Sequence, residues 1–472
     1  MSGPSRQPAQ TSSSPQDTLY EARKKLYVRA VSGVFANWRW VMVWLTQLVF
    51  YGLPWLSWND RQAVLFHLAE RKFYLFGWVF WPQDVFFLAV LLIISAYALF
   101  FFTAIAGRLW CGYACPQTVY TEIFMWIEQK IEGDHIRRQK LDQAEMSAPK
   151  ALRRGGKFLV WGLFSLWTGF TFVAYFSPLE ELLRSLPVFG FGPWELFWIL
   201  FYAAFTYLFA GVMREQVCTY MCPYARFQAV MFDPDTLVIT YDEERGEPRG
   251  ARKKGIDPKT VGKGDCIDCG ICVQVCPTGI DIRDGLQYEC IGCAACIDAC
   301  DQVMDRMDYP RGLIRYSTEN AVKKHWGRKE ILAHVFRPRT LIYGVILALV
   351  CIAFVWGLAV RDPLRVDIIR DRASLGREIE GGLIENVYRL QVMNMTEVPR
   401  TFRLEVSGLP GVRIGSGERV EVSPAATGAL TVQVLAPYDA GQPGANAIAF
   451  RITAEDDPGL SLREETTFLI PR

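Results

Sequence analysis

The sequence predicts a polytopic α-helical membrane protein with a cysteine-rich α+β insert and a C-terminal all-β sandwich of immunoglobulin type. Three observations predict this fold. The 472 residues are 51% hydrophobic and 14% aromatic, values typical of chains with membrane spans. Eight of the 13 cysteines lie between Cys266 and Cys300. Beyond Arg361 the apolar stretches give way to short β-rich runs separated by turn residues.

These changes in composition divide the chain into five parts. The first 19 residues are rich in Ser, Gln, Pro and Thr, which predicts disorder, and they lack the apolar core of a cleaved signal peptide. We expect the following organisation: 1–36, basic N-terminus; 37–230, four membrane helices with a basic loop at 108–157; 231–339, cysteine-rich module; 340–361, fifth membrane helix; 362–472, β-sandwich.

Five apolar stretches are the predicted spans. The first, 40–56, is flanked by tryptophans that suit a membrane interface, although Gln47 and Pro54 interrupt it. Each of the other four is long enough to cross a hydrocarbon core of about 30 Å at 1.5 Å per residue. Buried helices of a soluble protein are the alternative. The four uncharged stretches are 85–107, 158–179, 196–213 and 341–360.

The charges of the loops orient these spans. The loop at 178–195 has a single basic residue, Arg184, and by the positive-inside rule it lies outside. The N-terminus and the cysteine-rich module are then cytoplasmic, and the C-terminal sandwich is periplasmic. The loop predicted to be cytoplasmic has eight basic residues: Lys130, Arg137, Arg138, Lys140, Lys150, Arg153, Arg154 and Lys157.

The spacing of the eight clustered cysteines predicts a ferredoxin-like module with two [4Fe-4S] clusters. The first run reads C-x2-C-x2-C-x3-C-P, and the second repeats it with Asp301 in the place of the proline. In such modules the fourth cysteine of each run binds the cluster of the other run. Disulfides or a zinc ribbon are the alternatives. The predicted ligand sets are Cys266, Cys269, Cys272 and Cys300 for cluster 1, and Cys290, Cys293, Cys296 and Cys276 for cluster 2.

A second cysteine motif, C-x-x-x-C-P, ends the second and fourth predicted spans. Cys111 and Cys115 form one copy, and Cys218 and Cys222 form the other. Residues at i and i+4 share one face of a helix, so the four thiols are expected to meet near the cytoplasmic interface. Soft thiolates select Cu(I), zinc or iron–sulfur clusters, which predicts metal ligands or a redox pair. Packing as small apolar side chains is the alternative, and it is the interpretation we prefer for Cys351.

Three weaker patterns complete the prediction. The segment 119–131 has helical apolar periodicity and is either an amphipathic helix on the membrane surface or a core helix of its loop. With four histidines in the chain, a histidine metal site is not expected. Met393 and Met395 are assigned to packing or surface positions instead of copper contact. The predicted strands of the sandwich are 387–395, 401–406, 420–422, 430–435, 447–454 and 465–470.

Over residues 20–472 this order of motifs resembles the cytochrome oxidase accessory family called CcoG, FixG or RdxA. The local stretches MDYPRGLIRY at 307–316 and ENVYRLQVMN at 385–394 also carry the resemblance. It implies a bacterial inner-membrane protein that reduces Cu(II) to Cu(I) during assembly of cbb3-type cytochrome c oxidase. The eight clustered cysteines would hold the two [4Fe-4S] clusters. The four thiols of the C-x-x-x-C-P motifs would be the catalytic, copper-binding groups.

The same resemblance implies partners and leaves two other functions open. Expected partners are membrane lipid, copper ions, oxidase subunits or copper chaperones, and a cytoplasmic electron donor whose identity the sequence does not indicate. Nothing in the sequence indicates nucleic-acid binding. The first alternative function is a quinol-oxidising iron–sulfur subunit that feeds a periplasmic reductase. The second is a copper-binding assembly scaffold without catalysis, in which the sandwich holds the partner.

Overall fold

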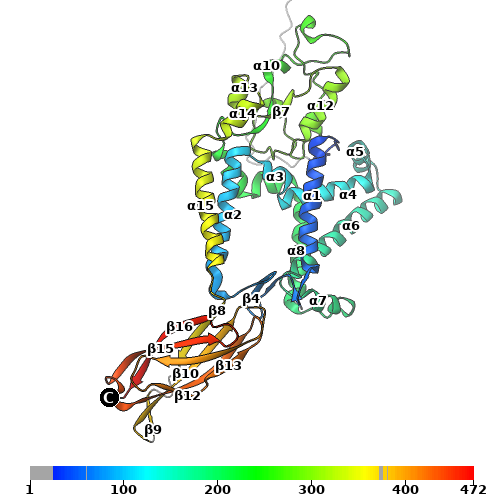
Figure 1. Ribbon diagram of the computed structural model, residues 1–472. Helices are drawn as coiled ribbons and strands as arrows, with labels where there is room; N and C mark the ends of the chain where they lie inside the picture. The colour runs from blue at the N-terminus through cyan, green and yellow to red at the C-terminus, as the bar shows by residue number, and fades with distance from the viewer. Residues whose placement is uncertain (1–24, 60, 372–375, 380, 472) are drawn as a thin grey trace, which may run out of the picture.

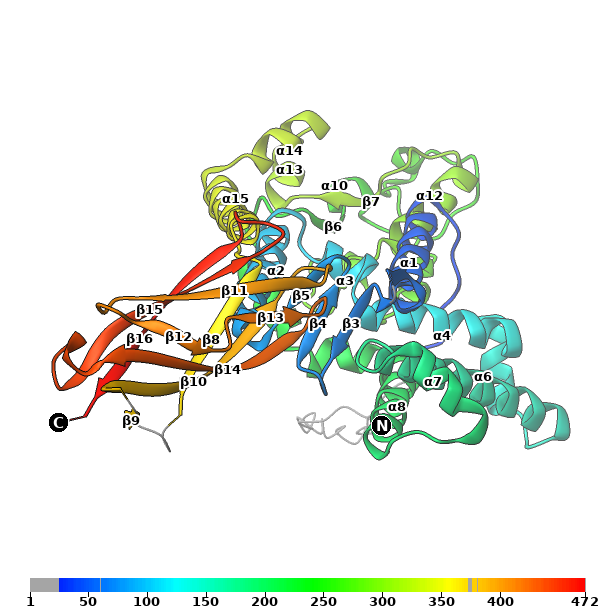
Figure 2. The same cartoon turned by 60° about the horizontal axis from the view of Figure 1, so that its bottom comes forward.

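The computed structural model describes residues 25–59, 61–371, 376–379 and 381–471. The disorder predicted for residues 1–19 lies outside them. A cysteine-rich lobe, a layer of helices and a β-sandwich follow one another along the long axis (Figure 1), and a second view, turned so that the bottom comes forward, shows the strands of the sandwich along their length (Figure 2). The lobe and the sandwich therefore lie on opposite sides of the helical layer.

Four helical stretches of the described residues are long and apolar enough to cross a membrane. They correspond to the second to fifth predicted spans, and their mean hydropathies lie between 1.2 and 2.8. The helix of the third predicted span, 158–179, begins ten residues before the predicted boundary, at Ala148, because the basic segment before residue 158 is itself helical. The four stretches are Pro82–Ala106, which includes α2 (Val85–Ala106); α6 (Ala148–Val173); Pro193–Met213, formed by α8 (Pro193–Thr206) and the π-helical η4 (Tyr207–Met213); and α15 (Pro338–Ala359).

The first predicted span differs from these four. Its residues form α1 (Val34–Gly52), which starts before the predicted boundary and contains Arg39, a buried side chain 3.8 Å from Glu122. Among the described residues, α1 is not one of the helices that are long and apolar enough to cross a membrane. A fifth span at this place stays a prediction.

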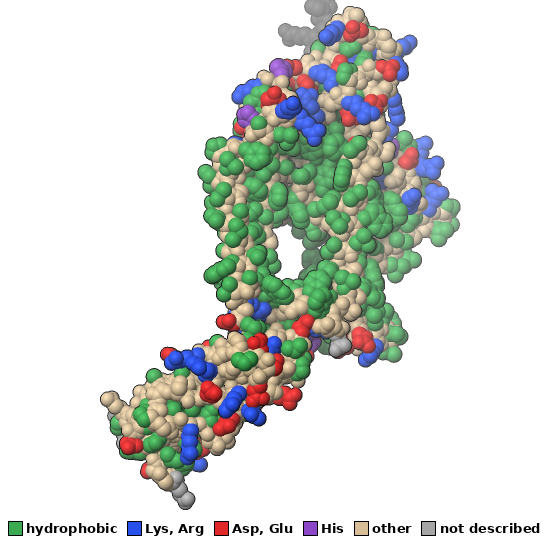
Figure 3. All heavy atoms as spheres, in the orientation of Figure 1, with side chains coloured by type: hydrophobic (Ala, Val, Ile, Leu, Met, Phe, Trp, Pro, Cys, Tyr) green, Lys and Arg blue, Asp and Glu red, His purple; other side chains and the backbone are tan. Residues whose placement is uncertain are grey.

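The helices of the layer form two groups. In the first, α2 and α15 lie side by side and are held together at both ends, at one end by the buried Asp84 and at the other by Arg337, which donates to the carbonyl oxygen of Ala104 at 2.8 Å. Asp84 lies 3.0 Å from Arg365, and Asp233 binds Arg337 and Arg339 at 2.8 and 2.9 Å. Figure 3 shows apolar side chains over both groups and an opening between them.

The second group is built around α6. Gly169 lets α6 approach the carbonyl oxygen of Ile199 in α8 so closely that a Cβ atom would clash with it. The 116–132 segment forms α4 (Pro116–Glu132), whose Phe124 and Ile127 pack against Trp161. The structure thus supports the second of the two alternatives for this segment, a core helix instead of a surface helix. The following α5 (His135–Gln143) extends the layer.

The cysteine-rich lobe has the predicted α+β character. Strand β6 (Val238–Tyr241) pairs antiparallel with β7 (Ile314–Ser317), although 73 residues separate Tyr241 from Ile314. The short α11 (Ile271–Gln274) and the longer α12 (Ala295–Met307) cover this ladder, and the apolar core includes Met304 and Leu313. Three short helices complete the lobe: α10 (Glu243–Gly246), α13 (Glu319–Lys323) and α14 (Arg328–Val335).

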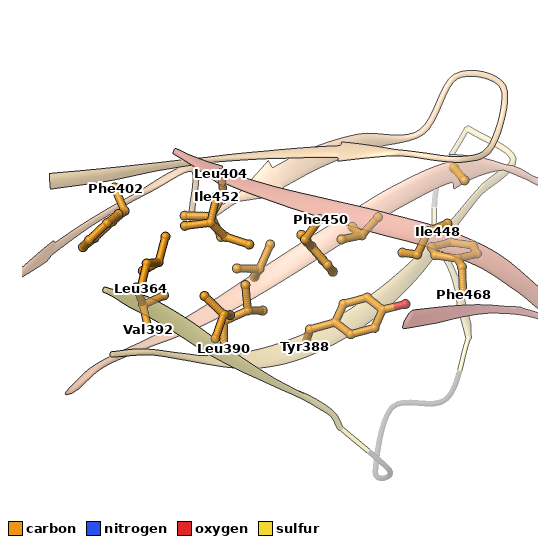
Figure 4. Close-up of a cluster of buried hydrophobic side chains, with 14 of the residues drawn as sticks. Leu364, Tyr388, Leu390, Val392, Phe402, Leu404, Ile448, Phe450, Ile452 and Phe468 are labelled. Carbon is orange, nitrogen blue, oxygen red and sulfur yellow. The ribbon is translucent and has the colours of Figure 1, made fainter. Parts of the chain in front are cut away.

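The C-terminal domain is a sandwich of two antiparallel sheets, as predicted. One sheet has the order β12-β14-β10-β8 with β9 paired to β10, and the other has the order β13-β11-β15-β16. Tyr388, Phe402, Phe450 and Phe468 fill the space between them (Figure 4). The sequence analysis missed β8, β9 and β12. The strands are β8 (Leu364–Arg370), β9 (Arg377–Ile379), β10 (Leu383–Asn394), β11 (Arg400–Ser407), β12 (Arg413–Ser416), β13 (Arg419–Val422), β14 (Thr427–Pro437), β15 (Gly444–Ala454) and β16 (Ser461–Ile470).

A small β-structure between α1 and α2 joins the sandwich to the helices. Buried Met395 packs against its residues Leu65 and Tyr74, and Glu397 binds Arg61 at 2.6 Å. The prediction that Met393 and Met395 serve packing agrees with their burial. The sequence analysis missed these strands because each is only two to four residues long. They are β1 (Ser57–Trp58), β2 (Arg61–Gln62), β3 (Val64–His67), β4 (Lys72–Leu75) and β5 (Trp78–Phe80).

Candidate metal centres

The first candidate centre is an apolar cavity of the lobe between α11 and α12. Four cysteines line it together with side chains such as Met304 and Leu313. Two of the four thiols are buried, whereas the side chain of Cys269 is exposed. The four are Cys266, Cys269, Cys272 and Cys300, which are the cysteines that the spacing assigns to cluster 1.

The second candidate centre is a neighbouring cavity on the side of the lobe that faces the helical layer. Ile239, Ile282 and Ile291 line it, and so does Cys272 of the first set. The chain reverses after α11, which carries the last cysteine of the first run into this cavity, while α12 carries Cys300 into the other. The four remaining cysteines, Cys276, Cys290, Cys293 and Cys296, all line the second cavity, and they are those assigned to cluster 2.

The residues present in both cavities fit a [4Fe-4S] cluster. Burial raises the pKa of Cys272 to about 11 and the pKa of Cys290 and Cys300 to about 12, so that a positive centre is needed to hold them as thiolates. A single zinc ion requires four sulfurs about 2.3 Å from one point. Among the described residues, no group of three or more His, Cys, Asp or Glu side chains is arranged for one metal ion. Four thiols around a cavity therefore suit a multinuclear cluster better than zinc.

The two C-x-x-x-C-P motifs differ from the predicted geometry. The spans end before them, at Ala106 and Met213, because Gly107 and Arg214 adopt positive φ angles of 53° and 45°. The cysteines of each pair therefore do not share one face of a continuing helix. Cys111 lies in the short α3 (Leu109–Tyr113) and Cys218 in the π-helical η5 (Val217–Met221), whereas Cys115 and Cys222 directly precede α4 and α9 (Pro223–Met231).

The four thiols nevertheless lie in one region. Burial raises the pKa of Cys218 to about 12, and the nearby thiols of Cys115, Cys111 and Cys222 raise it further because like charges repel. The thiol of Cys111 donates a hydrogen bond to the side-chain oxygen of Gln228 at 3.3 Å, and that glutamine is fully buried. The structure thus brings the predicted residues together, although not in the arrangement that a single ion requires.

The thiol region is in direct contact with the second cavity. Cys111 and Cys218 pack against a buried apolar cluster that includes Cys293, and Cys296 packs against the same cluster. A Cβ atom on Gly112 would lie 2.7 Å from the carbonyl oxygen of Gly292 and 2.9 Å from the Cα atom of Cys293. Only a glycine at position 112 allows α3 to approach the cysteine loop this closely. Cys351, in contrast, lies half-buried within α15, and its packing role stays a prediction.

Arg108 holds the two regions together. Its side chain is buried, and it donates hydrogen bonds to the carbonyl oxygens of Tyr288, Cys290 and Ala225. These three carbonyls belong to the cysteine loop and to α9, so one guanidinium joins the end of α2 to both. A charged residue at the end of an apolar span is the sequence signal for this role, and the sequence analysis did not use it.

Asp298 provides a second attachment of the lobe. Its carboxylate accepts hydrogen bonds from the backbone N–H groups of Phe35 and Ala36, at 3.2 and 2.7 Å, at the start of α1. A carboxylate is favourable there because the first N–H groups of a helix have no partner within it. Gly33 leaves the space that the carboxylate occupies. The lobe is thereby fixed to α1 as well as to α2 and α9.

Three family models match parts of the chain. A "4Fe-4S dicluster domain" matches residues 213–319 and covers both cavities, and a "4Fe-4S binding domain" matches residues 88–133 and covers Cys111 and Cys115. The model described as "IG-like fold at C-terminal of FixG, putative oxidoreductase" matches residues 354–471. Together with the candidate spans, these matches define a membrane-spanning iron–sulfur protein that transfers electrons.

Two curated relatives cover almost the whole chain. "Nitrogen fixation protein FixG" of Rhizobium meliloti is 38% identical over 476 residues, which are 93% of this chain and 91% of the relative. "Protein RdxA" of Cereibacter sphaeroides is 40% identical over 456 residues, 94% of this chain and 96% of the relative. A solved FixG-related protein from Vibrio parahaemolyticus is 28% identical and covers 23% of this chain and 97% of its own, with a TM-score of 0.21. The chain belongs to the FixG/RdxA family.

Proposed function

We propose that this protein reduces Cu(II) to Cu(I) at the four thiols of the C-x-x-x-C-P turns, for the copper site of a cbb3-type cytochrome c oxidase. The observation that carries the proposal is the contact between the thiol region and the second cavity, where Gly112 lies against Gly292 and Cys293. A redox-active metal ion held by Cys111 and Cys218 would lie beside the cysteines of that cavity.

The clusters held by the eight lobe cysteines would supply single electrons at low potential. Reduction of Cu(II) consumes one such electron and needs no proton, and soft sulfur stabilises the Cu(I) that forms. The thiols of Cys111, Cys115, Cys218 and Cys222 are the proposed copper ligands, and binding of one ion would draw them closer together than they lie in this structure. Gln228 accepts a hydrogen bond from Cys111 and orients that thiol. Because the four side chains are only partly buried, a copper ion can reach them.

The charge of the loops and the placement of the lobe and the sandwich on opposite sides of the helical layer support a proposed location. We place the protein in a bacterial inner membrane with five spans, the lobe in the cytoplasm and the sandwich in the periplasm. Two observations support this orientation. Basic residues crowd the segment 130–157, and a reducing compartment preserves the eight lobe thiols. The sandwich would then face the oxidase subunits or the copper chaperones.

The test is an anaerobic titration of the purified, full-length protein with Cu(II) after reduction by dithionite and removal of excess reductant. We expect the iron–sulfur absorbance to be restored as Cu(I) forms, with one Cu(I) for each electron removed. The variant with Cys111, Cys115, Cys218 and Cys222 replaced by serine should keep its iron and lose this reaction. Cys351→Ser is the matched control and should behave as the wild type.

Two outcomes would overturn the proposal. If the fourfold serine variant reduces Cu(II) at the wild-type rate, the thiols of the turns are not the site. If the wild type binds copper while its iron–sulfur absorbance and the copper valence stay unchanged, the protein is a binding scaffold. Reduction of the clusters by a quinol in membranes, without any reaction with copper, would support the quinol-oxidising alternative.

A further inference from the structure

The lobe also has a surface that suits the protein that delivers the electrons. The two cavities differ in their access to solvent: the second adjoins the helices, whereas in the first the side chain of Cys269 is exposed. Electron transfer between proteins requires close approach, so a soluble carrier has to dock near Cys269. The residues around this cysteine therefore indicate what kind of carrier fits.

A basic segment, 250–263, covers the end of the lobe farthest from the sandwich (Figure 1). It is anchored next to the first cavity, because the backbone N–H of Gly250 and the guanidinium of Arg252 both bind the carbonyl oxygen of Cys266, at 3.1 and 3.4 Å. It contains one acidic residue, Asp257, and five basic residues: Arg252, Lys253, Lys254, Lys259 and Lys263. The segment therefore carries a net charge of +4 from five basic and one acidic residue.

The positive charge of this segment is only partly neutralised. Lys254 pairs with Asp308 at 2.8 Å, but Lys253, Lys259 and Lys263 have no ion pair with any residue that the structure describes. Two carboxylates close to the first cavity are neutralised by arginines. Asp268 lies 2.6 Å from Arg283, and Asp265 lies 2.5 Å from Arg245. The positive charge that can attract a partner protein is therefore that of Lys253, Lys259 and Lys263.

We propose that the segment 250–263 is the docking surface for a small acidic one-electron carrier of the flavodoxin or ferredoxin type. Complementary charge steers such a carrier and holds it transiently beside Cys269. A small interface is sufficient, since electron-transfer complexes are weak and bury little area. One electron leaves the reduced carrier and enters the iron–sulfur lobe, and no bond or proton is exchanged. The proposal concerns electron uptake and holds whether or not copper is the acceptor.

The test uses anaerobic stopped-flow mixing of the full-length oxidised protein with a reduced flavodoxin. The variant K253E/K259E/K263E should be reduced about tenfold more slowly than the wild type at low ionic strength. Added salt should slow the wild type and remove most of the difference. Reduction by dithionite and the iron content should be the same in both proteins, which separates docking from damage to the clusters.

A matched variant, K324E/R328E/K329E, changes three exposed basic residues around α13 and α14, on the flank of the lobe above α15. It should react with the flavodoxin as the wild type does. The proposal is overturned if K253E/K259E/K263E is reduced by the flavodoxin at the wild-type rate. It is also overturned if this rate falls by the same factor in both triple variants. Failure of copper reduction in the titration described above would leave these rates unchanged, so the two proposals fail separately.

Discussion

The two cavities of the lobe have the same cysteine spacing and different surroundings. The first has an exposed thiol at Cys269 and a basic segment beside it, while the second is enclosed by Cys111, Cys218 and the glycine contact at Gly112. The spacing decides which thiols can share a cluster, but it does not say which cluster faces which partner. The difference between the cavities indicates a direction for electron transfer. Electrons would enter from solvent at the first cavity and leave from the second cavity toward the thiols of Cys111 and Cys218.

The largest expected effect comes from removing one ligand of each cavity. Cys269→Ala and Cys293→Ala should each lose about half of the bound iron, because each set of four thiols holds one of two clusters. Cys269→Ala should slow reduction by flavodoxin, and Cys293→Ala should abolish Cu(II) reduction by the dithionite-reduced protein. Iron analysis and the two rates check this. Identical losses of both rates in the two variants would contradict the direction inferred here.

A substitution at the contact between the regions should have the next largest effect. In Gly112→Ala the new methyl group meets backbone atoms of Gly292 and Cys293, which cannot move as freely as a side chain, so α3 and the cysteine loop must separate. We expect Cu(II) reduction to fall by about tenfold or more, with unchanged iron content, since displacements of about 1 Å can cost this much. The measurement is the rate of Cu(I) formation.

Gly162→Ala provides the control for this change. Position 162 lies in α6 and has open space where its Cβ atom would be. That variant should keep the wild-type rate. A normal rate in Gly112→Ala would show that the close contact is not needed for electron transfer.

Removal of the buried guanidinium should destabilise the attachment of the lobe. Arg108→Met leaves the carbonyl oxygens of Tyr288, Cys290 and Ala225 without this donor. Hydrogen bonds to a charged group contribute about 1.5–3 kcal/mol each, so losing three of them is expected to cost about 4.5 kcal/mol or more. The thermal unfolding midpoint in detergent measures it. Arg184→Met, at an exposed side chain paired with the equally exposed Glu180, should leave the midpoint unchanged.

The smallest effect is expected at the start of α1. Asp298→Asn keeps the shape of the side chain and removes the negative charge that Phe35 and Ala36 face. The cost should be about 1 kcal/mol, as for other charges at helix N-termini. Hydrogen exchange of residues 34–40 should become faster, whereas Asp305→Asn on the exposed side of α12 should not alter it. Equal exchange in both variants would mean that the carboxylate does not hold α1.

Local patterns in the sequence determined most of the architecture. Cysteine spacing assigned the same two sets of four thiols that line the two cavities, because short motifs with closely spaced ligands leave the chain little freedom. Apolar stretches of sufficient length located the four candidate spans, and β-rich runs between turn residues located six of the nine strands of the sandwich. Each of these features depends on residues near one another in the chain.

Only the tertiary structure decided how these parts meet. The sequence analysis expected each pair of C-x-x-x-C-P cysteines on one helix, but positive φ angles at Gly107 and Arg214 end the spans earlier. Arg108, Gly112 and Asp298 have no local motif, because their partners lie more than 100 residues away in the chain. Spacing along the chain therefore grouped the thiols that line each cavity, whereas long-range packing and hydrogen bonding decided which cavity adjoins the thiols of the C-x-x-x-C-P motifs and which faces solvent.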